Sequence, residues 1–207
     1  MTRLVLTTAP AVEPLTASEA KARLNLSSAD DTVINALIKS ARQELDGWGG
    51  WLGRALISQT WTMYLGGFSD CIAVPLPPVQ SIASIKYIDP DGVEQTLSTG
   101  VYQLMPGNPV TIVRKFDQAW PDVRQQDDAV RVAFVAGYGA AGSDVPENIR
   151  SAICLRVASL YQLMERNLFV SEDTVDGVGT VKYTVGQNAG MIMDKAIESL
   201  LSPYRVW

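Results

Sequence analysis

The chain contains no histidine, and its 207 residues include only two cysteines. Without histidine there is no Ser-His-Asp or Cys-His arrangement, and the commonest general base and metal ligand of proteins is missing. Cys71 and Cys154 lie far apart in the sequence, so they form neither a zinc motif nor a disulfide framework. These absences argue against an enzyme and predict no metal site. They are compatible with a reducing cytosol.

Long hydrophobic runs and an excess of basic charge are also missing. No apolar stretch approaches the ~20 residues that cross a membrane, and residues 1–10 lack the apolar region of an export signal. Seventeen basic and 22 acidic residues give a net charge of −5, so the basic surface of a nucleic-acid-binding protein is absent. We expect a soluble cytoplasmic product with a substantial core and no affinity for membranes.

One glycine-rich stretch has the spacing of a dinucleotide-binding loop. Residues 137–142 read GYGAAG and lie between a strand-like run, 129–135, and a helical pattern. However, residues 143–146 separate the glycines from the helix whose first amides would bind the pyrophosphate, and Asp144 would repel that group. The acidic residue that binds the ribose would fall inside a long helix. We therefore favour a flexible turn and expect no cofactor, with a nucleotide-binding enzyme as the alternative.

Both ends of the chain have the periodicity of helices. Apolar residues recur every three or four positions in four stretches, at residues 16–26, 31–48, 146–166 and 189–201. Thr16 followed by Glu19 predicts a capping box at the start of the first helix. We expect the helix at 31–48 to pack against the helix at 146–166, with Trp48 and Cys154 in the core. Arg150 and Arg156 are expected away from the apolar face.

The middle of the chain alternates polar and apolar residues, as half-buried strands do. The alternating runs are residues 58–65, 82–88, 93–97, 101–105, 110–116 and 129–135. The proline-rich run 72–79 predicts an extended edge segment, because proline has no N–H to donate to a sheet. Asp89 and Asp91 fit a turn, and Asp127 and Asp128 fit a loop, better than they fit a metal site.

These patterns predict an α+β fold. A small helical bundle, residues 1–56 and 143–207, carries an inserted and mainly antiparallel β subdomain, residues 57–142. Each helical end is too short to bury its own apolar face, so the two ends should pack together. Residues 171–188 are polar and rich in glycine, with a possible strand at 181–185. We expect this segment to be mobile or ordered only by a partner.

Several segments, taken together and in order, resemble the head–tail connector (portal adaptor) proteins of tailed bacteriophages and prophages. They read LTASEAKARLNL (15–26), DDTVINALIKSARQELDGW (30–48), GRALISQTW (53–61), PLPPVQSIASIKYIDPDG (75–92), AGYG (136–139), VPENIRSAICLRVASLY (145–161) and LLSPYRVW (200–207). The matching segments span nearly the whole chain, and residues 171–188 are its least family-like part.

The resemblance implies a structural protein of the virion neck, made in the host cytoplasm, and not an enzyme. Such adaptors form a homo-oligomeric ring, usually of twelve copies, beneath the portal protein. The ring extends the DNA channel and docks the stopper or tail-completion protein. DNA passes through without sequence-specific binding. A net acidic chain would limit adhesion of DNA to the channel, although −5 is also an ordinary solubility charge.

The C-terminal segment is the predicted interface with the portal or a neighbouring subunit. It consists of Leu200, Leu201, Pro203, Tyr204, Arg205, Val206 and Trp207. Tyr, Trp and Arg are the residues that most often anchor protein interfaces. The alternative is that Trp207 folds back onto its own domain. Three other functions stay open: a stopper or tail-completion protein, a nucleotide-binding enzyme, and a ligand-binding β module carried by a helical stalk.

Overall fold

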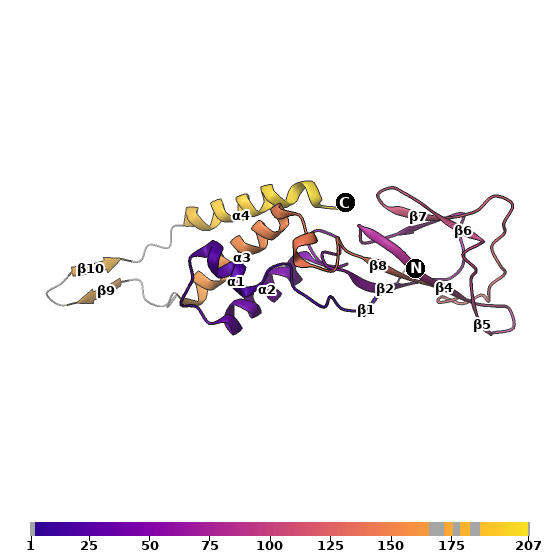
Figure 1. Ribbon diagram of the computed structural model, residues 1–207, viewed down its shortest axis with the longest axis horizontal. Coiled ribbons are helices and arrows are strands. Elements are labelled where there is room, and N and C mark those ends of the chain that lie inside the picture. Colours follow the sequence, from indigo (N-terminus) through magenta and orange to yellow (C-terminus); the bar gives the residue numbers. More distant parts are fainter. Residues whose placement is uncertain (1–2, 166–171, 176–178, 183–186, 207) are drawn as a thin grey trace. The chain divides into compact units, whose positions relative to one another are not determined.

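The computed structural model describes residues 3–165, 172–175, 179–182 and 187–206 (Figure 1). Helices lie towards both ends of the chain and antiparallel strand pairs dominate its middle, so the predicted α+β fold is confirmed. The chain divides into two compact units. The sheet unit is Met1–Val12, Leu45–Val145 and Val206–Trp207, and the helical unit is Glu13–Glu44 and Pro146–Arg205.

A five-stranded antiparallel sheet in the order β1-β2-β8-β4-β5 forms one layer of the sheet unit. Its strands are β1 (Arg3–Thr8), β2 (Gln59–Leu65), β8 (Val130–Ala136), β4 (Val79–Ile88) and β5 (Glu94–Thr96). The central strand β8 is paired on both sides and buries every second residue, from Val130 to Ala136. This alternation is the pattern that the sequence predicted, because successive side chains of a strand point to opposite faces.

A second, three-stranded sheet supplies the other half of the same core. Its order is β3 (Cys71–Val74), β7 (Val110–Arg114) and β6 (Tyr102–Met105), so β3 is an edge strand, as the prolines after it predicted. Ile72 and Ile112 of this sheet are buried in one hydrophobic cluster with Met63, Val132 and Phe134 of the five-stranded sheet. The two sheets therefore share a single apolar core.

Strand β1 is absent from the sequence prediction, which placed residues 1–56 in the helical part. The structure instead pairs β1 with β2 and assigns residues 45–56 to the sheet unit. The alternation of β1 is weak because, as an edge strand, it leaves most of its side chains exposed. A strand exposed on both faces has no period-two signal for sequence analysis to detect.

The described part of the helical unit contains four α-helices: α1 (Ala17–Leu24), α2 (Asp31–Leu45), α3 (Glu147–Glu165) and α4 (Gln187–Leu201). The predicted capping box is confirmed at the start of α1. The Glu19 amide donates to Thr16 Oγ1 at 3.1 Å, and the Thr16 amide donates to Glu19 Oε2 at 2.9 Å. Asn25 ends the helix in the left-handed conformation, with φ of 56°.

Helix α3 lies along α4 and also contacts α1. Its inner face is apolar and buried, including Ile149, Ile153 and Val157. The predicted packing of α2 against α3 stays a prediction, because the main partners of α3 are α4 and α1. An ion pair does join α2 and α3: Arg156 Nε donates to Glu44 Oε2 at 2.8 Å. Burial of apolar faces of this size is what stabilises short helices in proteins.

Two predicted core residues have opposite outcomes. Cys154 is buried, as expected, and burial raises the pKa of its thiol, which leaves it unreactive. The prediction for Trp48 is wrong, since its side chain is 62% exposed. Helix α2 ends at Leu45 and the chain turns at Gly47, with φ of 85°, so Trp48 no longer lies on the apolar stripe of the helix.

The segment between α3 and α4 contains an antiparallel hairpin. Its strands are β9 (Glu172–Val175) and β10 (Gly179–Lys182), and they form a two-stranded sheet of their own. The predicted strand at 181–185 overlaps the end of β10. Residues 166–171, 176–178 and 183–186 lie outside the described residues, so the predicted mobility of this segment stays a prediction.

Candidate functional site

The predicted C-terminal interface follows directly from helix α4. Leu201 is buried at the end of the helix, Ser202–Tyr204 form a 3-10 turn, and Pro203 is exposed. The other described members are half-buried: Leu200, Tyr204, Arg205 and Val206. Trp207 lies outside the described residues, so whether it folds back or reaches a partner stays open.

The end of the chain is bound to an earlier part of the sheet unit. The Val206 amide donates to the Leu52 carbonyl at 3.0 Å. Gly53 has φ of 61°, and a Cβ atom at this position would lie 3.5 Å from the Val206 carbonyl oxygen. The side of this segment that faces Leu52 and Gly53 is therefore occupied by contacts within the chain.

The glycine-rich loop is occupied by contacts within the chain. The Gly137 amide donates to the Pro78 carbonyl at 2.9 Å, and the Gly139 carbonyl accepts from the Ser58 amide at 2.8 Å. Gly137 has φ of 131°, and a Cβ there would lie 2.5 Å from the Ile57 carbonyl carbon. The first glycine is therefore required by close backbone packing, independently of any ligand.

An acidic side chain fills the place that a phosphate would need in this loop. Asp144 Oδ2 accepts from the Ala141 amide at 2.9 Å, and the Asp144 side chain packs against Gly139. In a dinucleotide site the free backbone amides would bind phosphate. Here a carboxylate already holds one of them, and its negative charge would oppose an anion. The geometry thus matches a structural turn.

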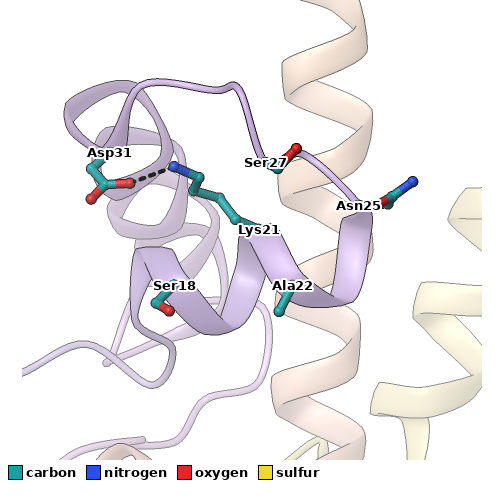
Figure 2. A pocket seen from close by; sticks show the side chains of 6 residues that line it. All are labelled: Ser18, Lys21, Ala22, Asn25, Ser27 and Asp31. Carbon is teal, nitrogen blue, oxygen red and sulfur yellow. Dashed lines mark hydrogen bonds and ion pairs between the residues drawn. The ribbon is translucent and has the colours of Figure 1, made fainter.

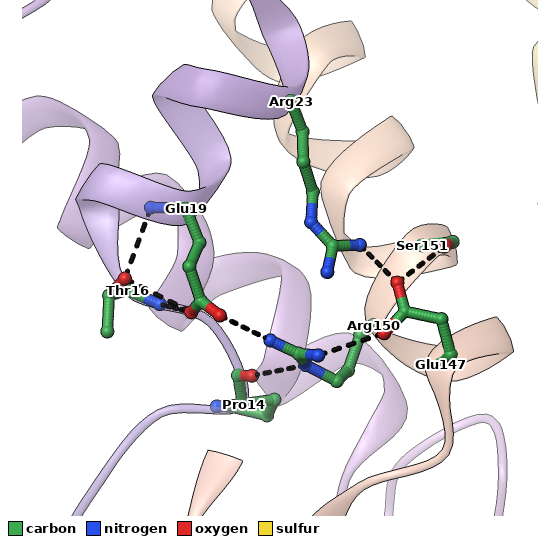
Figure 3. Close-up of polar contacts among 7 residues, drawn as sticks. All are labelled: Pro14, Thr16, Glu19, Arg23, Glu147, Arg150 and Ser151. Atoms are coloured by element: carbon green, nitrogen blue, oxygen red, sulfur yellow. Dashed lines mark hydrogen bonds and ion pairs between the residues drawn. The ribbon is translucent and has the colours of Figure 1, made fainter. Parts of the chain in front are cut away.

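The most extensive polar network lies where α1 and α3 begin (Figure 3). The guanidinium of the buried Arg150 donates to the Pro14 carbonyl at 3.1 Å, to Glu147 at 2.9 Å and to Glu19 at 2.6 Å. Arg23 of α1 forms an ion pair with the same Glu147. One charged cluster therefore ties the segment before α1, α1 itself and α3 together.

This network holds its carboxylates in the ionised form. The hydrogen bond from Arg23 is the largest cause that lowers the pKa of Glu147. The backbone amide of Thr16 is the largest cause that lowers the pKa of Glu19, and Arg150 adds to it. The sequence placed Arg150 away from the apolar face of the helix and did not predict its burial. Sequence analysis missed the network because no local spacing connects residue 150 with residues 14 and 19.

A shallow polar hollow lies beside α1 (Figure 2). Its lining is Ser18, Lys21, Ala22, Asn25, Ser27 and Asp31. Lys21 Nζ and Asp31 Oδ1 form an ion pair at 2.8 Å across it, so the ammonium group is neutralised by a neighbour within the chain. The hollow therefore presents hydroxyl and amide groups rather than a net charge to solvent.

Two of the aspartates considered as metal ligands, Asp89 and Asp128, instead bind partners close to them in the sequence. Asp89 accepts from the Val93 amide at 2.8 Å and from Gln95, which closes the turn that the sequence predicted. Asp128 pairs with Arg131 at 3.1 Å. Hydrogen bonds lower the pKa of both aspartates. Within the described ranges, no group of three or more acidic or cysteine side chains gathers in a way that could hold a metal ion.

Large apolar side chains are exposed at separate places on the surface. Phe116 is 98% exposed at a turn after β7, and Val5 and Leu6 are each 41% exposed on β1. Four more are exposed on α3 and α4: Leu163, Met164, Met191 and Ile192. Exposed apolar residues that are scattered over a surface are ordinary, so these positions do not by themselves mark a contact with another macromolecule. Of the helices that the structure describes, none is long and apolar enough to span a membrane.

No protein-family model matches the chain, and no curated protein matches it. Among solved structures, it is similar to a chain of the virion of a native gene transfer agent (GTA) particle, with 20% identity and a TM-score of 0.65 over 99% of this chain and 95% of that one. A chain in the neck of an empty GTA particle, computed with C6 symmetry, has 19% identity and a TM-score of 0.65 over 99% and 96%. A chain in the neck of the native particle, computed with C12 symmetry, has 20% identity and a TM-score of 0.60 over 98% and 96%. The chain therefore shares its fold, along nearly its whole length, with chains of these particles.

Proposed function

We propose that this protein is a structural component of the neck of a tailed phage or phage-like particle, and specifically the head–tail adaptor. In this role it forms a ring beneath the portal protein, extends the DNA channel and docks the stopper or tail-completion protein. DNA passes through the ring without sequence-specific binding. No catalytic step is part of the proposed function.

The observation that carries the proposal is the similarity in fold to chains of GTA particles, two of them from structures of the neck. The alignment with the virion chain covers 99% of this protein and 95% of its counterpart, so both units and their order in the chain are shared. The resemblance of the sequence segments to head–tail connectors points to the same role independently.

A ring of identical subunits places a requirement on the surface. Each subunit must present two different and complementary patches, because a head-to-tail contact joins unlike surfaces and closes only at a defined rotation. The neck structures to which this chain is similar were computed with C6 and C12 symmetry. We infer a ring of twelve copies from the adaptor family, with the segment from Leu200 to Trp207 as the part that faces the portal.

The experiment that tests the adaptor role mixes the purified protein with its cognate portal. Light scattering and electron microscopy then give the stoichiometry and the position of the added density. We expect a ring on the side of the portal that faces the tail. The same mixture is repeated with a variant that ends at Leu201, which removes most of the predicted portal-facing segment.

The possible outcomes distinguish between the adaptor role, the C-terminal contact and the stopper role. A ring that is lost on truncation supports both the adaptor role and the C-terminal contact. If the ring still forms after truncation, the adaptor role is supported and the proposed C-terminal contact is rejected. Binding only to a preformed portal–adaptor complex favours the stopper or tail-completion protein. Absence of association at every salt concentration rejects the adaptor role.

A titration with NAD, FAD and ATP tests the enzyme alternative. We expect no binding, because the Ala141 amide is already bonded to Asp144 and Gly137 is packed against Ile57. Saturable binding that is lost in a Gly137→Ala variant that keeps its fold would instead support a nucleotide site. A glycan and peptide screen with the full chain tests the ligand-module alternative in the same way.

A further inference from the structure

The outer edge of β1 is an open strand edge. This strand is the last in its sheet and, in the described part of the chain, pairs only with β2. A register shift lies between Leu6 and Thr8, so the regular part is Arg3–Leu6. Open edges present unpaired amide and carbonyl groups that accept a strand from another chain.

The other outer strands of the two sheets are protected in ways that β1 is not. Edge strand β3 is followed by Pro75, and edge strand β6 is followed by Pro106. Strand β5, at the opposite edge of the five-stranded sheet, has only three residues. Proline and short length are devices by which proteins prevent edge pairing. The regular part of β1 has four residues, like β3 and β6, but no proline lies next to the strand: Pro10 is two residues beyond Thr8. Val5 and Leu6 of β1 are exposed.

The hairpin of β9 and β10 has no third strand in the described part of the chain, and β1 of another copy could supply one. It forms a separate two-stranded sheet, and neither strand pairs with any other described strand. An isolated two-stranded hairpin is at best marginally stable in water, and a third strand adds the missing ladder of hydrogen bonds. Strand β9 has four residues, which equals the length of the regular part of β1.

We propose that the β9–β10 hairpin of one copy adds to the β1 edge of a second copy and extends its five-stranded sheet. The contact joins unlike surfaces, so it is head-to-tail, as a ring requires. Strand β9 contains Glu172 and Asp173, and β1 contains Arg3, whereas β10 contains Lys182. Opposite charges favour β9 as the strand beside β1. This inference rests on the proposed function for its biological setting, but the pairing itself can be tested without portal.

The test uses two single-defect variants of the full chain. Val5→Glu places a negative charge in the middle of β1, which repels the acidic strand β9 and opposes strand addition. In the second variant a Gly/Ser linker replaces residues 172–182, which removes the hairpin and leaves β1 intact. Val93→Glu is the matched control, because Val93 is an exposed valine outside β1. Sedimentation velocity over a concentration series measures self-association, and circular dichroism verifies that each variant is folded.

We expect the wild type and Val93→Glu to self-associate, and each single-defect variant to stay monomeric. An equimolar mixture of the two defective variants should form dimers and nothing larger, because one copy retains the hairpin and the other retains the open edge. Association of the hairpin-free variant at the wild-type level would overturn the inference. So would a wild type that stays monomeric throughout, or defective variants that do not combine when mixed.

The portal experiment distinguishes failure of this inference from failure of the proposed function. If the hairpin-free variant still forms the complete ring on the portal, the strand contact is wrong and the adaptor role stands. If wild-type copies pair through β1 and the hairpin but do not bind the portal, the strand contact stands and the adaptor role is wrong.

Discussion

At the scale of single residues, Arg150 holds three partners with one buried guanidinium. Arg150→Met keeps most of the side-chain volume but removes the hydrogen bonds to Pro14, Glu19 and Glu147. Hydrogen bonds to charged groups contribute about 1.5–3 kcal/mol each at most, and the two carboxylates can regain water, so we expect a loss of about 2 kcal/mol in the free energy of unfolding. Urea denaturation measures this change.

The control for Arg150 is a second arginine of α3. Arg156 forms an exposed ion pair with Glu44, and such pairs contribute up to about 1 kcal/mol. Arg156→Met should therefore lower stability by less than Arg150→Met does. Equal effects of the two substitutions would contradict a special role for the buried guanidinium.

The close packing around Gly137 leads to a second prediction about the free energy of unfolding. Its φ of 131° disfavours any side chain, and a Cβ would collide with the Ile57 backbone. Gly137→Ala should lower the unfolding free energy by at least about 2 kcal/mol. Gly49 has nothing within 4 Å of its Cβ position and no positive φ, so Gly49→Ala should change it by no more than about 0.5 kcal/mol. Thermal unfolding of both variants makes the comparison, and equal midpoints would refute it.

At the scale of elements, the cluster between α1 and α3 makes the helical unit sensitive to acid. The pKa values of Glu19 and Glu147 lie below the ordinary value of 4.5, so the folded state holds protons less readily than the unfolded state. Their contribution to stability is complete above the unfolded pKa and is lost as the pH falls through the folded pKa. We expect the free energy of unfolding to fall below about pH 4.5.

The variant Glu147→Gln tests the source of this acid sensitivity. It removes one of the two carboxylates, so the unfolding free energy should be lower at pH 7 and should depend less on pH below 4.5 than in the wild type. Chemical denaturation at several pH values between 7 and 3 provides the curve. An unchanged slope would assign the acid sensitivity to other carboxylates.

Helix α4 contains a glycine that its surroundings do not require. Gly190 lies within the helix, has no positive φ, and has nothing within 4 Å of its Cβ position. Because alanine loses less backbone entropy than glycine in a helix, Gly190→Ala should raise the unfolding free energy by about 0.5–1 kcal/mol. A calorimetric midpoint below that of the wild type would show that this position makes a contact that alanine disrupts.

At the scale of the whole molecule, the end of the chain contributes to stability as well as to the proposed interface. Val206→Pro removes the N–H that donates to Leu52 and retains every other residue of the segment. Loss of this bond should cost about 1 kcal/mol and lower the midpoint of thermal unfolding by about 2–4 °C. If Val206→Pro unfolds at the wild-type temperature, the bond contributes nothing in solution.

The same variant clarifies the portal experiment. If truncation at Leu201 abolishes ring formation but Val206→Pro does not, the side chains of the segment bind the partner directly. If both variants fail to form the ring while remaining folded, the position of the segment on Leu52 and Gly53 is part of the binding surface.

Features that depend on neighbours a few positions apart could be predicted from the sequence. The spacing of apolar residues located α2 and α3, alternation located β2 and β8, and the capping box of Thr16 and Glu19 fixed the start of α1. The order of helices and strands then led to the α+β class. Each of these signals is local, because helical and strand periodicities repeat within a few residues.

Contacts between segments that are far apart in the chain depend on the complete fold and could not be predicted from local patterns. Arg150 bonds to Glu19, 131 positions away, and Gly139 bonds to Ser58, and no local pattern encodes either contact. Trp48 has the spacing of a core residue, but the turn at Gly47 directs it to solvent. Strand β1 has no clear alternation and belongs to the sheet only because β2 offers it an edge. Long-range hydrogen bonds and packing, which depend on the complete fold, override local preference at these positions.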